Sequence, residues 1–313
     1  MNTASRDHML GVIAVLFASI VWGTTGTAAT FAPNVSAVAI GAAAMGIGGL
    51  LQAARAHRII ARSLPQLLRF RPLLLIGGIS VAIYPLAFYS SMRLAGVTIG
   101  TVVTIGSAPL LSALIELVFD RTPLTRRWIA GALVGLVGIV LLASAEGAPL
   151  HSATVGGDHL VPGILCGLIG GLTYALYSWS ARSLMLRGIP SSAAMGATFG
   201  IGGILLLPVL FVTGAPFLAS WNNAAVGIYM AVVPMFMGYV AFGFALARIS
   251  ASMAITITLI EPVVAAVLAV LIVGERLPPI GWLGVALVIS CLVLITLPLR
   301  LRRLSRAGTV TEN

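Results

Sequence analysis

The chain is a succession of long apolar stretches separated by short polar connections. A helix needs roughly 20 mainly apolar residues to cross a bilayer, and the sequence divides into about ten stretches of that kind. The pattern therefore predicts an all-α membrane protein. The predicted spans are residues 9–31, 34–54, 72–93, 97–118, 127–145, 160–183, 192–213, 222–247, 250–273 and 279–299.

Composition excludes a water-soluble protein. Hydrophobic residues make up 59% of the sequence and charged residues only 8%, whereas soluble domains carry roughly 25% charged residues. No segment is left over for a soluble domain of ordinary size. The two cysteines, Cys166 and Cys291, fall inside predicted spans and indicate neither a disulfide framework nor a metal site.

The net charge of +10 does not indicate nucleic-acid binding, because the arginines lie at the ends of apolar stretches rather than along one polar face. Basic residues gather on the cytoplasmic side of membrane proteins. With the N-terminus in the cytoplasm, only Arg93 and Arg276 of the 18 basic residues lie outside. Both termini are therefore predicted to be cytoplasmic.

The two halves of the chain resemble each other. Pro109 and Pro262 are 153 residues apart, and Trp22 aligns with Tyr174 one residue off that register. Five spans per half is an odd number, so the second copy has to insert upside down relative to the first. Inverted repeats of this kind are typical of transporters with a central site.

This repeat divides the sequence into four parts. We expect a first five-span repeat at 1–148, a periplasmic linker at 149–159, a second five-span repeat at 160–299 and a basic cytoplasmic tail at 300–313. Small residues in the fifth and tenth spans, including Gly138 and Gly284, predict a close helix contact that joins the halves.

Several segments carry a family resemblance. Residues 259–265 (LIEPVVA), 271–277 (LIVGERL) and 282–284 (WLG) resemble the end of an EamA domain of the drug/metabolite transporter superfamily. Residues 107–111 (SAPLL) and 128–131 (WIAG) form a degraded copy, which lacks the glutamate before the proline.

The resemblance implies a ten-helix exporter of amino acids or other small metabolites in the bacterial inner membrane. Within the superfamily it favours the YddG-like amino-acid exporters. It also implies that the first, third, fourth, sixth, eighth and ninth spans surround the cavity. Such a protein has a small-molecule substrate, lies in the lipid bilayer, and is a monomer or a homodimer.

The residues themselves indicate no enzyme, cofactor or metal site, because the sequence shows no nucleotide-binding loop, metal cluster or nucleophile arrangement. A membrane-embedded enzyme would need clustered histidine or acidic residues, and none is found. A transporter of the same fold for a drug, a nucleotide sugar or a lipid-linked carrier is the other alternative. Phosphate-bearing substrates favour basic residues inside the cavity, and no arginine lies at mid-depth.

Polar and aromatic side chains within the spans are the candidates for contacting a solute. Aromatic faces attract ammonium groups, and tyrosine hydroxyls can orient a carboxylate; the alternative for each is packing. Glu261 is a candidate for substrate or proton contact because an intramembrane carboxylate is costly, although it could also satisfy backbone groups at the nearby kink. The predicted substrate-binding residues are Trp22, Tyr84, Tyr89, Thr101, Thr104, Tyr174, Tyr177, Tyr239, Thr258 and Glu261.

Prolines inside spans remove helix hydrogen bonds and free the preceding carbonyls. Pro85, Pro109, Pro234 and Pro262 are therefore the predicted hinges, against the alternative that they only bend their helices. Glu116 lies near the cytoplasmic end of the fourth span, close in sequence to several arginines. An interfacial ion pair is the predicted role for it.

Overall fold

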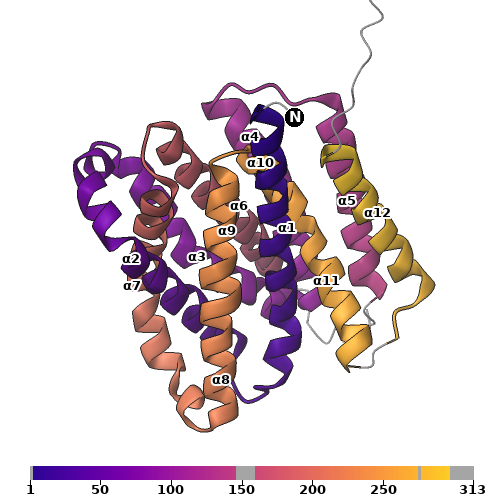
Figure 1. Cartoon of the computed structure of the whole chain (residues 1–313). Helices are drawn as coiled ribbons and strands as arrows, with labels where there is room; N and C mark the ends of the chain where they lie inside the picture. The colour runs from indigo at the N-terminus through magenta and orange to yellow at the C-terminus, as the bar shows by residue number, and fades with distance from the viewer. Residues whose placement is uncertain (1–2, 146–158, 274–275, 297–313) are drawn as a thin grey trace, which may run out of the picture.

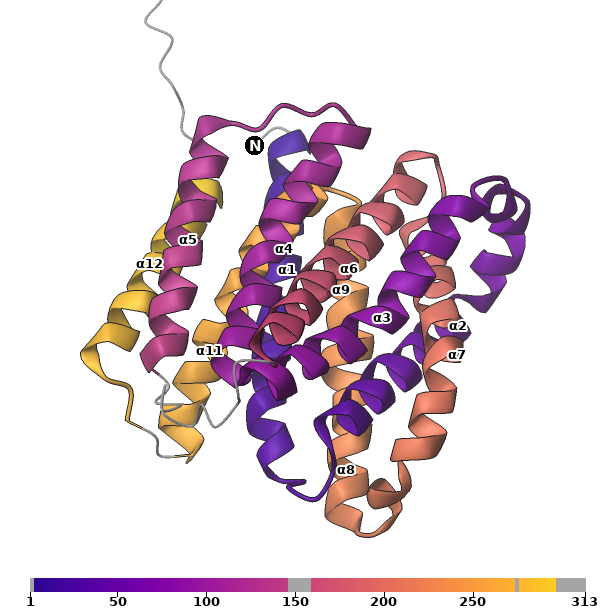
Figure 2. The same ribbon diagram turned by 180° about the vertical axis from the view of Figure 1, so that it is seen from behind.

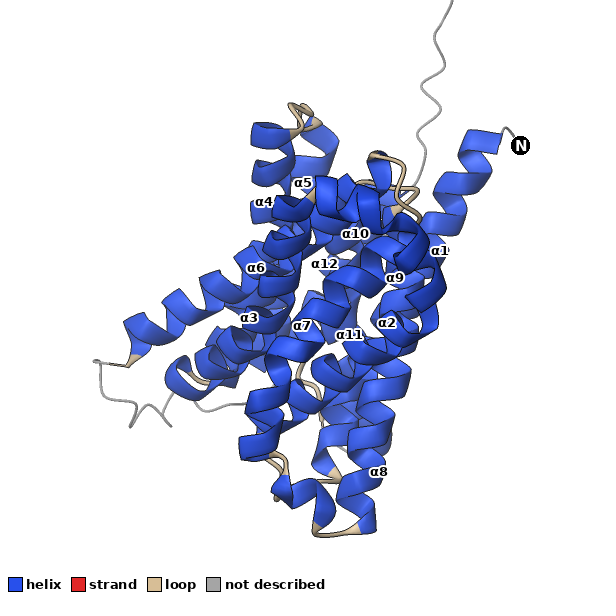
Figure 3. Cartoon of the chain, turned by 90° about the vertical axis from the view of Figure 1, so that its left-hand side faces the viewer, coloured by secondary structure: helices blue, strands red, loops and turns tan. Residues whose placement is uncertain are grey.

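The described part of the chain is a bundle of ten helices that are each long and apolar enough to cross a membrane (Figure 1). The computed structural model describes residues 3–145, 159–273 and 276–296. Apart from His159, the predicted linker 149–159 lies outside the described residues, and so does the tail 300–313. Every regular element in these ranges is helical (Figure 3), which confirms the all-α membrane fold.

Eight of the spans are single helices, and the eighth and ninth in chain order are built from several segments. The single helices are α1 (Thr3–Thr30), α2 (Ala37–Arg69), α3 (Arg71–Ala95), α4 (Val97–Phe119), α5 (Arg126–Ala145), α6 (Leu160–Leu186) and α7 (Ser191–Thr213), with α12 (Pro279–Thr296) as the tenth span.

The eighth span consists of α8 (Trp221–Met230), a π-helical segment (Ala231–Gly238) and α9 (Tyr239–Leu246). The ninth consists of α10 (Ala251–Ile257), a 3₁₀ turn (Thr258–Ile260), α11 (Glu261–Leu268) and a second π-helical segment (Ala269–Val273). Pro234 lies in the first π segment and Pro262 follows the 3₁₀ turn. Non-α segments within helices commonly mark functional sites.

Serine side chains begin several of these helices. The hydroxyl oxygens of Ser36, Ser220 and Ser250 accept hydrogen bonds from backbone N–H groups in the first turns of α2, α8 and α10. Such capping satisfies donors that have no partner inside the helix. At Gly96, which has φ +89°, α3 ends and the chain turns directly into α4. Only glycine adopts this conformation without strain.

The ten spans form two five-helix repeats with inverted topology. Equivalent spans pack on each other, α2 on α7 and α5 on α12, and the second pair lies apart at one edge of the bundle (Figures 1 and 2). In Figure 1 the start of α1 and the end of α12 lie at the top, which we name the N-terminal end, and α8 begins at the opposite end.

The two repeats interlock by exchanging their first helices. In the second repeat α6 packs mainly on α3 and α4 of the first, while α1 packs on the eighth and ninth spans. A site at the centre is therefore surrounded by helices of both repeats, and neither half can form its wall alone.

Sequence reasoning placed the second span at 34–54 and a connection at 55–71, whereas α2 continues as a helix to Arg69. Thirty-three residues of helix measure about 50 Å, well beyond the ~30 Å hydrocarbon core. The extension is stabilised because buried Leu67 and partly buried Ile60 join a hydrophobic cluster with Ile189, which precedes α7, and Ala193, in the first turn of α7. The arginines in this segment lower its mean hydropathy, so hydropathy alone does not reveal that one face of the helix stays apolar.

The contact between α5 and α12 depends on glycine. A Cβ atom added to Gly138 would lie 2.8 Å from the carbonyl oxygen of Gly284, whereas one added to Gly26 in α1 would meet no atom within 4 Å. We expect Gly138→Ala to push the helices apart and to destabilise the protein by about 1–3 kcal/mol. Gly26→Ala should leave the apparent melting temperature unchanged or raise it, since alanine favours helix.

Thermal unfolding of the two purified variants and the parent in the same detergent measures this difference. Equal melting temperatures for Gly138→Ala and the parent would contradict the close packing of α5 on α12.

Candidate functional site

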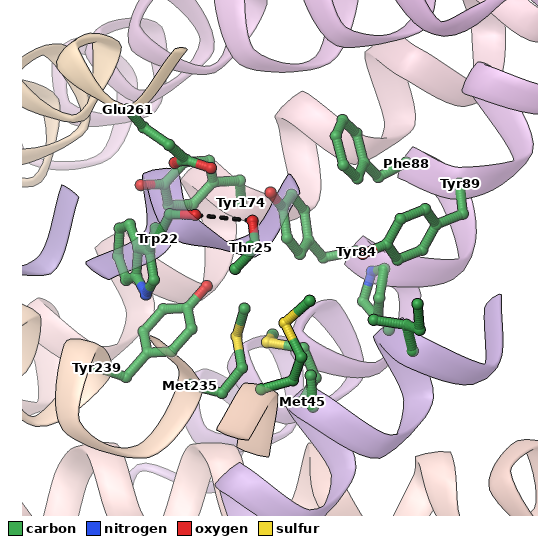
Figure 4. Close-up of a pocket in the computed structure, with 15 residues that line it drawn as sticks. Trp22, Thr25, Met45, Tyr84, Phe88, Tyr89, Tyr174, Met235, Tyr239 and Glu261 are labelled. Carbon is green, nitrogen blue, oxygen red and sulfur yellow. Dashed lines mark hydrogen bonds between the residues drawn. The ribbon is translucent and has the colours of Figure 1, made fainter. Parts of the chain in front are cut away.

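A cavity of about 60 Å³ lies in the centre of the bundle. It is bounded by the first, second, third, sixth, eighth and ninth spans, and several aromatic side chains line it (Figure 4). Its aromatic lining residues are Trp22, Tyr84, Phe88, Tyr89, Tyr174 and Tyr239. The other side chains that define it are Thr25, Met45, Pro85, Met230, Met235 and Glu261.

Six of the ten sequence-predicted residues line this cavity, namely Trp22, Tyr84, Tyr89, Tyr174, Tyr239 and Glu261. Two more stand directly behind it. The hydroxyl of Tyr177 lies 2.7 Å from that of Tyr239, and the hydroxyl of Thr258 lies 3.0 Å from that of Tyr174. Tyr177 and Thr258 therefore position cavity residues through hydrogen bonds.

Thr101 and Thr104 are absent from the cavity lining of the described chain. Thr104 is fully buried and faces Gly170 of α6, where an added Cβ would come within 2.8 Å of its methyl group. Glycines on α6 thus let α4 pack directly against that helix, which covers the threonine face. The fourth span is replaced around the cavity by the second, whose Gly41 and Ala44 leave room for the aromatic rings.

The predicted hinge prolines occupy different settings. Pro85 lines the cavity, although α3 continues through it, and Pro109 likewise lies inside the continuous helix α4. Pro234 and Pro262 stand where the eighth and ninth spans depart from α-helix. The repeat-equivalent pair Pro109 and Pro262 therefore does not produce equivalent backbones.

Trp22 is fixed by a hydrogen bond across the repeats. Its indole Nε1 donates to the carbonyl oxygen of Pro234 at 2.8 Å, within the π-helical segment. Its ring lies tilted against Tyr239 and Phe242, with centroid distances of 4.7 and 5.3 Å. The indole N–H thus bonds within the protein and is not free to bond a substrate.

Glu261 supplies the charge of the site. It lies at the start of α11, and in Figure 4 its side chain points toward Trp22 and Tyr174. Among the described residues its carboxylate has no hydrogen-bond partner, and no arginine or histidine lines the cavity. An unpaired carboxylate in apolar surroundings is poised to bind a proton or a cationic group.

The residues predicted from the sequence leave out several that line the cavity. Met45 and Met235 lie across the cavity from Glu261 (Figure 4), and flexible thioether chains suit a wall that adapts to its contents. Thr25 follows Trp22 by one helical turn and donates to its carbonyl at 2.7 Å. That spacing was the available signal, since residues three apart share a helix face. Among the described residues no group of three His, Cys, Asp or Glu side chains could hold a metal ion.

Comparison with known proteins identifies this architecture. The sequence profile of the "EamA-like transporter family" matches residues 9–144 and 161–297. The chain belongs to the EamA-like transporter family. It is therefore a multi-pass membrane transporter, as the family resemblance predicted.

The transporter is similar along most of its length to several curated proteins. It is 32% identical to the "Uncharacterized transporter YwfM" of Bacillus subtilis, over 94% of this chain and 96% of the relative. It is 27% identical to a "Probable terminal-alkyne amino-acid exporter" of Streptantibioticus cattleyicolor, over 88% and 92% of the two chains. It is 26% identical to the "Threonine/homoserine exporter RhtA" of Escherichia coli, over 92% and 91%.

A solved structure known only as "Crystal structure of protein" superposes on the transporter with a TM-score of 0.72. The alignment covers 91% of this chain and 95% of the other, at 19% sequence identity. At that identity the likeness shows the shared fold alone.

The bond between Trp22 and Pro234 leads to a test of the site. Trp22→Phe keeps an aromatic ring but removes the side-chain donor to a buried carbonyl, and the loss of such a hydrogen bond costs about 0.5–1.5 kcal/mol. We expect a lower apparent melting temperature in detergent for this variant. Trp221→Phe is the matched control, because Trp221 is 89% exposed and should leave the temperature unchanged. A Trp22→Phe protein as stable as the Trp221→Phe protein would rule out a stabilising bond.

Proposed function

We propose that this transporter exports amino acids or related small zwitterionic metabolites across the bacterial inner membrane, with both termini in the cytoplasm. The observation that supports this proposal best is a single unpaired carboxylate, Glu261, in an aromatic cavity that no basic side chain lines.

Glu261 would hold the ammonium group of the substrate. A charge-assisted hydrogen bond to a carboxylate contributes about 1.5–3 kcal/mol. The rings of Trp22 and Tyr174 lie beside it (Figure 4), and aromatic faces add cation–π attraction of about 0.5–2 kcal/mol. The carboxylate thus gives the site its preference for one positive charge.

The hydroxyl groups of the site would meet the carboxylate group of the substrate. Tyr84 and Tyr89 line the cavity, and among the described residues their hydroxyls make no hydrogen bond within the protein. Tyrosine hydroxyls can donate to a carboxylate without the full charge of an arginine. The same lining argues against the nucleotide-sugar and lipid-linked alternatives, because phosphate groups favour arginine or lysine partners.

The cavity has to widen for transport. Its volume of about 60 Å³ is far below the roughly 300–1,000 Å³ of typical ligand pockets. The breaks in the eighth and ninth spans, beside Pro234 and Pro262, supply segments that can bend without disrupting a continuous helix. Alternating access would then open the cavity to one side of the membrane at a time.

The relatives support the same substrate class. Two of them carry names that specify the export of amino acids, one of terminal-alkyne amino acids and one of threonine and homoserine. These names describe the relatives; for this chain they select the first substrates to test.

Reconstitution tests the proposal directly. Proteoliposomes that contain the transporter should move labelled threonine or homoserine faster than protein-free vesicles, and N-acetylthreonine should not compete, because it lacks the ammonium group that Glu261 would hold. No transport of any amino acid in a broad panel would contradict the proposed substrate class.

Glu261→Gln separates the two possible roles of the carboxylate. If Glu261 binds the substrate ammonium, the variant should raise KM by about 10- to 100-fold, the equivalent of 1.4–2.8 kcal/mol. If it carries a coupling proton instead, substrate exchange should persist while a pH gradient no longer drives net transport. Transport unchanged at every pH, with the same KM, would remove Glu261 from both roles.

A further inference from the structure

A second hollow lies at the N-terminal end of the bundle, away from the central cavity. It is a cleft of about 690 Å³, lined by Glu116, Asp120, Arg182 and Ser252 among others. Its size falls within the range of small-molecule sites, and it carries both charge signs. The cleft shares no lining residue with the central cavity.

Glu116 closes the inner edge of this cleft by bonding across the repeats. It is 5% exposed, and its carboxylate accepts from the backbone N–H of Ala251 at 2.7 Å and from the hydroxyl of Ser252. These contacts tie α4 of the first repeat to α10 of the second. Where the sequence predicts an interfacial ion pair for Glu116, the structure shows its carboxylate hydrogen-bonded to the start of α10.

Two further contacts strengthen the same closure. The indole Nε1 of Trp179 on α6 donates to the Asp120 carboxylate at 2.9 Å, which again joins the two repeats. The guanidinium of Arg182 donates to the carbonyls of Leu246 and Ile249 at the end of α9. Three polar contacts thus hold α4, α6, α9 and α10 together at this end.

Two buried hydroxyls lie one helical turn from charged residues of the cleft. Ser112 precedes Glu116 by four residues on α4, and Ser178 lies between Tyr174 and Arg182, four residues from each, on α6. Residues four apart share a helix face, so each serine continues the face that carries a residue of the cleft. Both side chains are fully buried, and neither has a hydrogen-bond partner among the described residues.

Buried hydroxyls without partners are rare, and each needs an explanation. We propose that Ser112 and Ser178 line the closed half of the translocation path, and that Glu116 is the latch that holds this half shut. The inference rests on the proposed transport function. When the latch releases α10, the two hydroxyls meet water and the polar groups of a small zwitterionic solute passing between cleft and cavity.

The second repeat has no carboxylate at the position equivalent to Glu116. The register that pairs Pro109 with Pro262 places Ala269 opposite Glu116, and alanine cannot cap a helix through its side chain. The latch therefore stabilises one of the two states of the inverted repeats, the one closed at the N-terminal end.

Cysteine labelling tests the proposal without any substrate. In a protein whose own thiols are removed by Cys166→Ser and Cys291→Ala, Ser178→Cys should react slowly with a small polar maleimide. Adding Glu116→Gln, which keeps the side-chain shape but removes the charge, should speed the reaction at least tenfold. Asp7→Asn is the control for charge removal, since Asp7 is exposed and its ion-pair partner is Arg248 rather than a residue of α10, and it should change nothing.

The matched control for position is Ser180→Cys. Ser180 is as fully buried as Ser178 but lies on another face of α6, where its hydroxyl donates to the Leu73 carbonyl. Its cysteine should stay slow in both backgrounds. An unchanged rate for Ser178→Cys in the Glu116→Gln protein, or an equal rise for Ser180→Cys, would overturn the latch.

If Glu116→Gln does not yield folded protein, the two cysteine variants can be compared in the protein that keeps Glu116. Ser178→Cys should then label at least tenfold faster than Ser180→Cys, because the path opens each time the empty transporter leaves its resting state; equal rates would overturn the proposal. Since labelling needs no substrate, a failed transport assay and a failed labelling assay are separate results.

Discussion

A polar backbone group buried among apolar side chains needs a hydrogen-bond partner, and the bond from Trp22 to the Pro234 carbonyl lies in such surroundings at the centre of the molecule. The π-helical segment presents that carbonyl to α1, and Gly238 leaves room for the indole, since a Cβ there would lie 2.6 Å from Nε1. Once the indole is held, Tyr239 and Phe242 have fixed neighbours. The arrangement of the aromatic side chains around the cavity therefore depends on this one hydrogen bond to the π-helical segment of the eighth span.

Hydrogen bonds also make one side of the cavity more rigid than the other. Tyr174 is bonded to Thr258 and Tyr239 to Tyr177, so hydroxyl pairs connect α6 to the eighth and ninth spans. Across from Glu261, Met45 and Met235 present chains with several rotatable bonds. A site built this way can hold the charged end of a substrate firmly while it accepts side chains of different shapes.

The sequence predicted what depends on hydrophobicity, charge and repetition. Apolar length located the spans, and the proline register revealed the repeat, which in turn drew attention to Trp22 and Tyr174. It did not predict contacts that depend on how helices meet. Thr104 carries a hydroxyl that could contact a solute, but it faces glycines of α6. The sequence of α4 alone does not show which helix packs on that face. The extension of α2 and the bond from Glu116 to α10 are likewise decided by neighbours distant in sequence.

The two repeats have diverged so that each contributes a carboxylate the other lacks. Glu261 in the second repeat corresponds to Ala108 in the first, and Glu116 in the first corresponds to Ala269 in the second. Identical inverted repeats would give two states of equal energy. A bias of about 2.7 kcal/mol is enough to populate one state 99 times in 100, and one charge-assisted hydrogen bond contributes about 1.5–3 kcal/mol. A single acidic residue at one end of the bundle can therefore set the resting state, while the other, at the centre, is left for the substrate role proposed for Glu261.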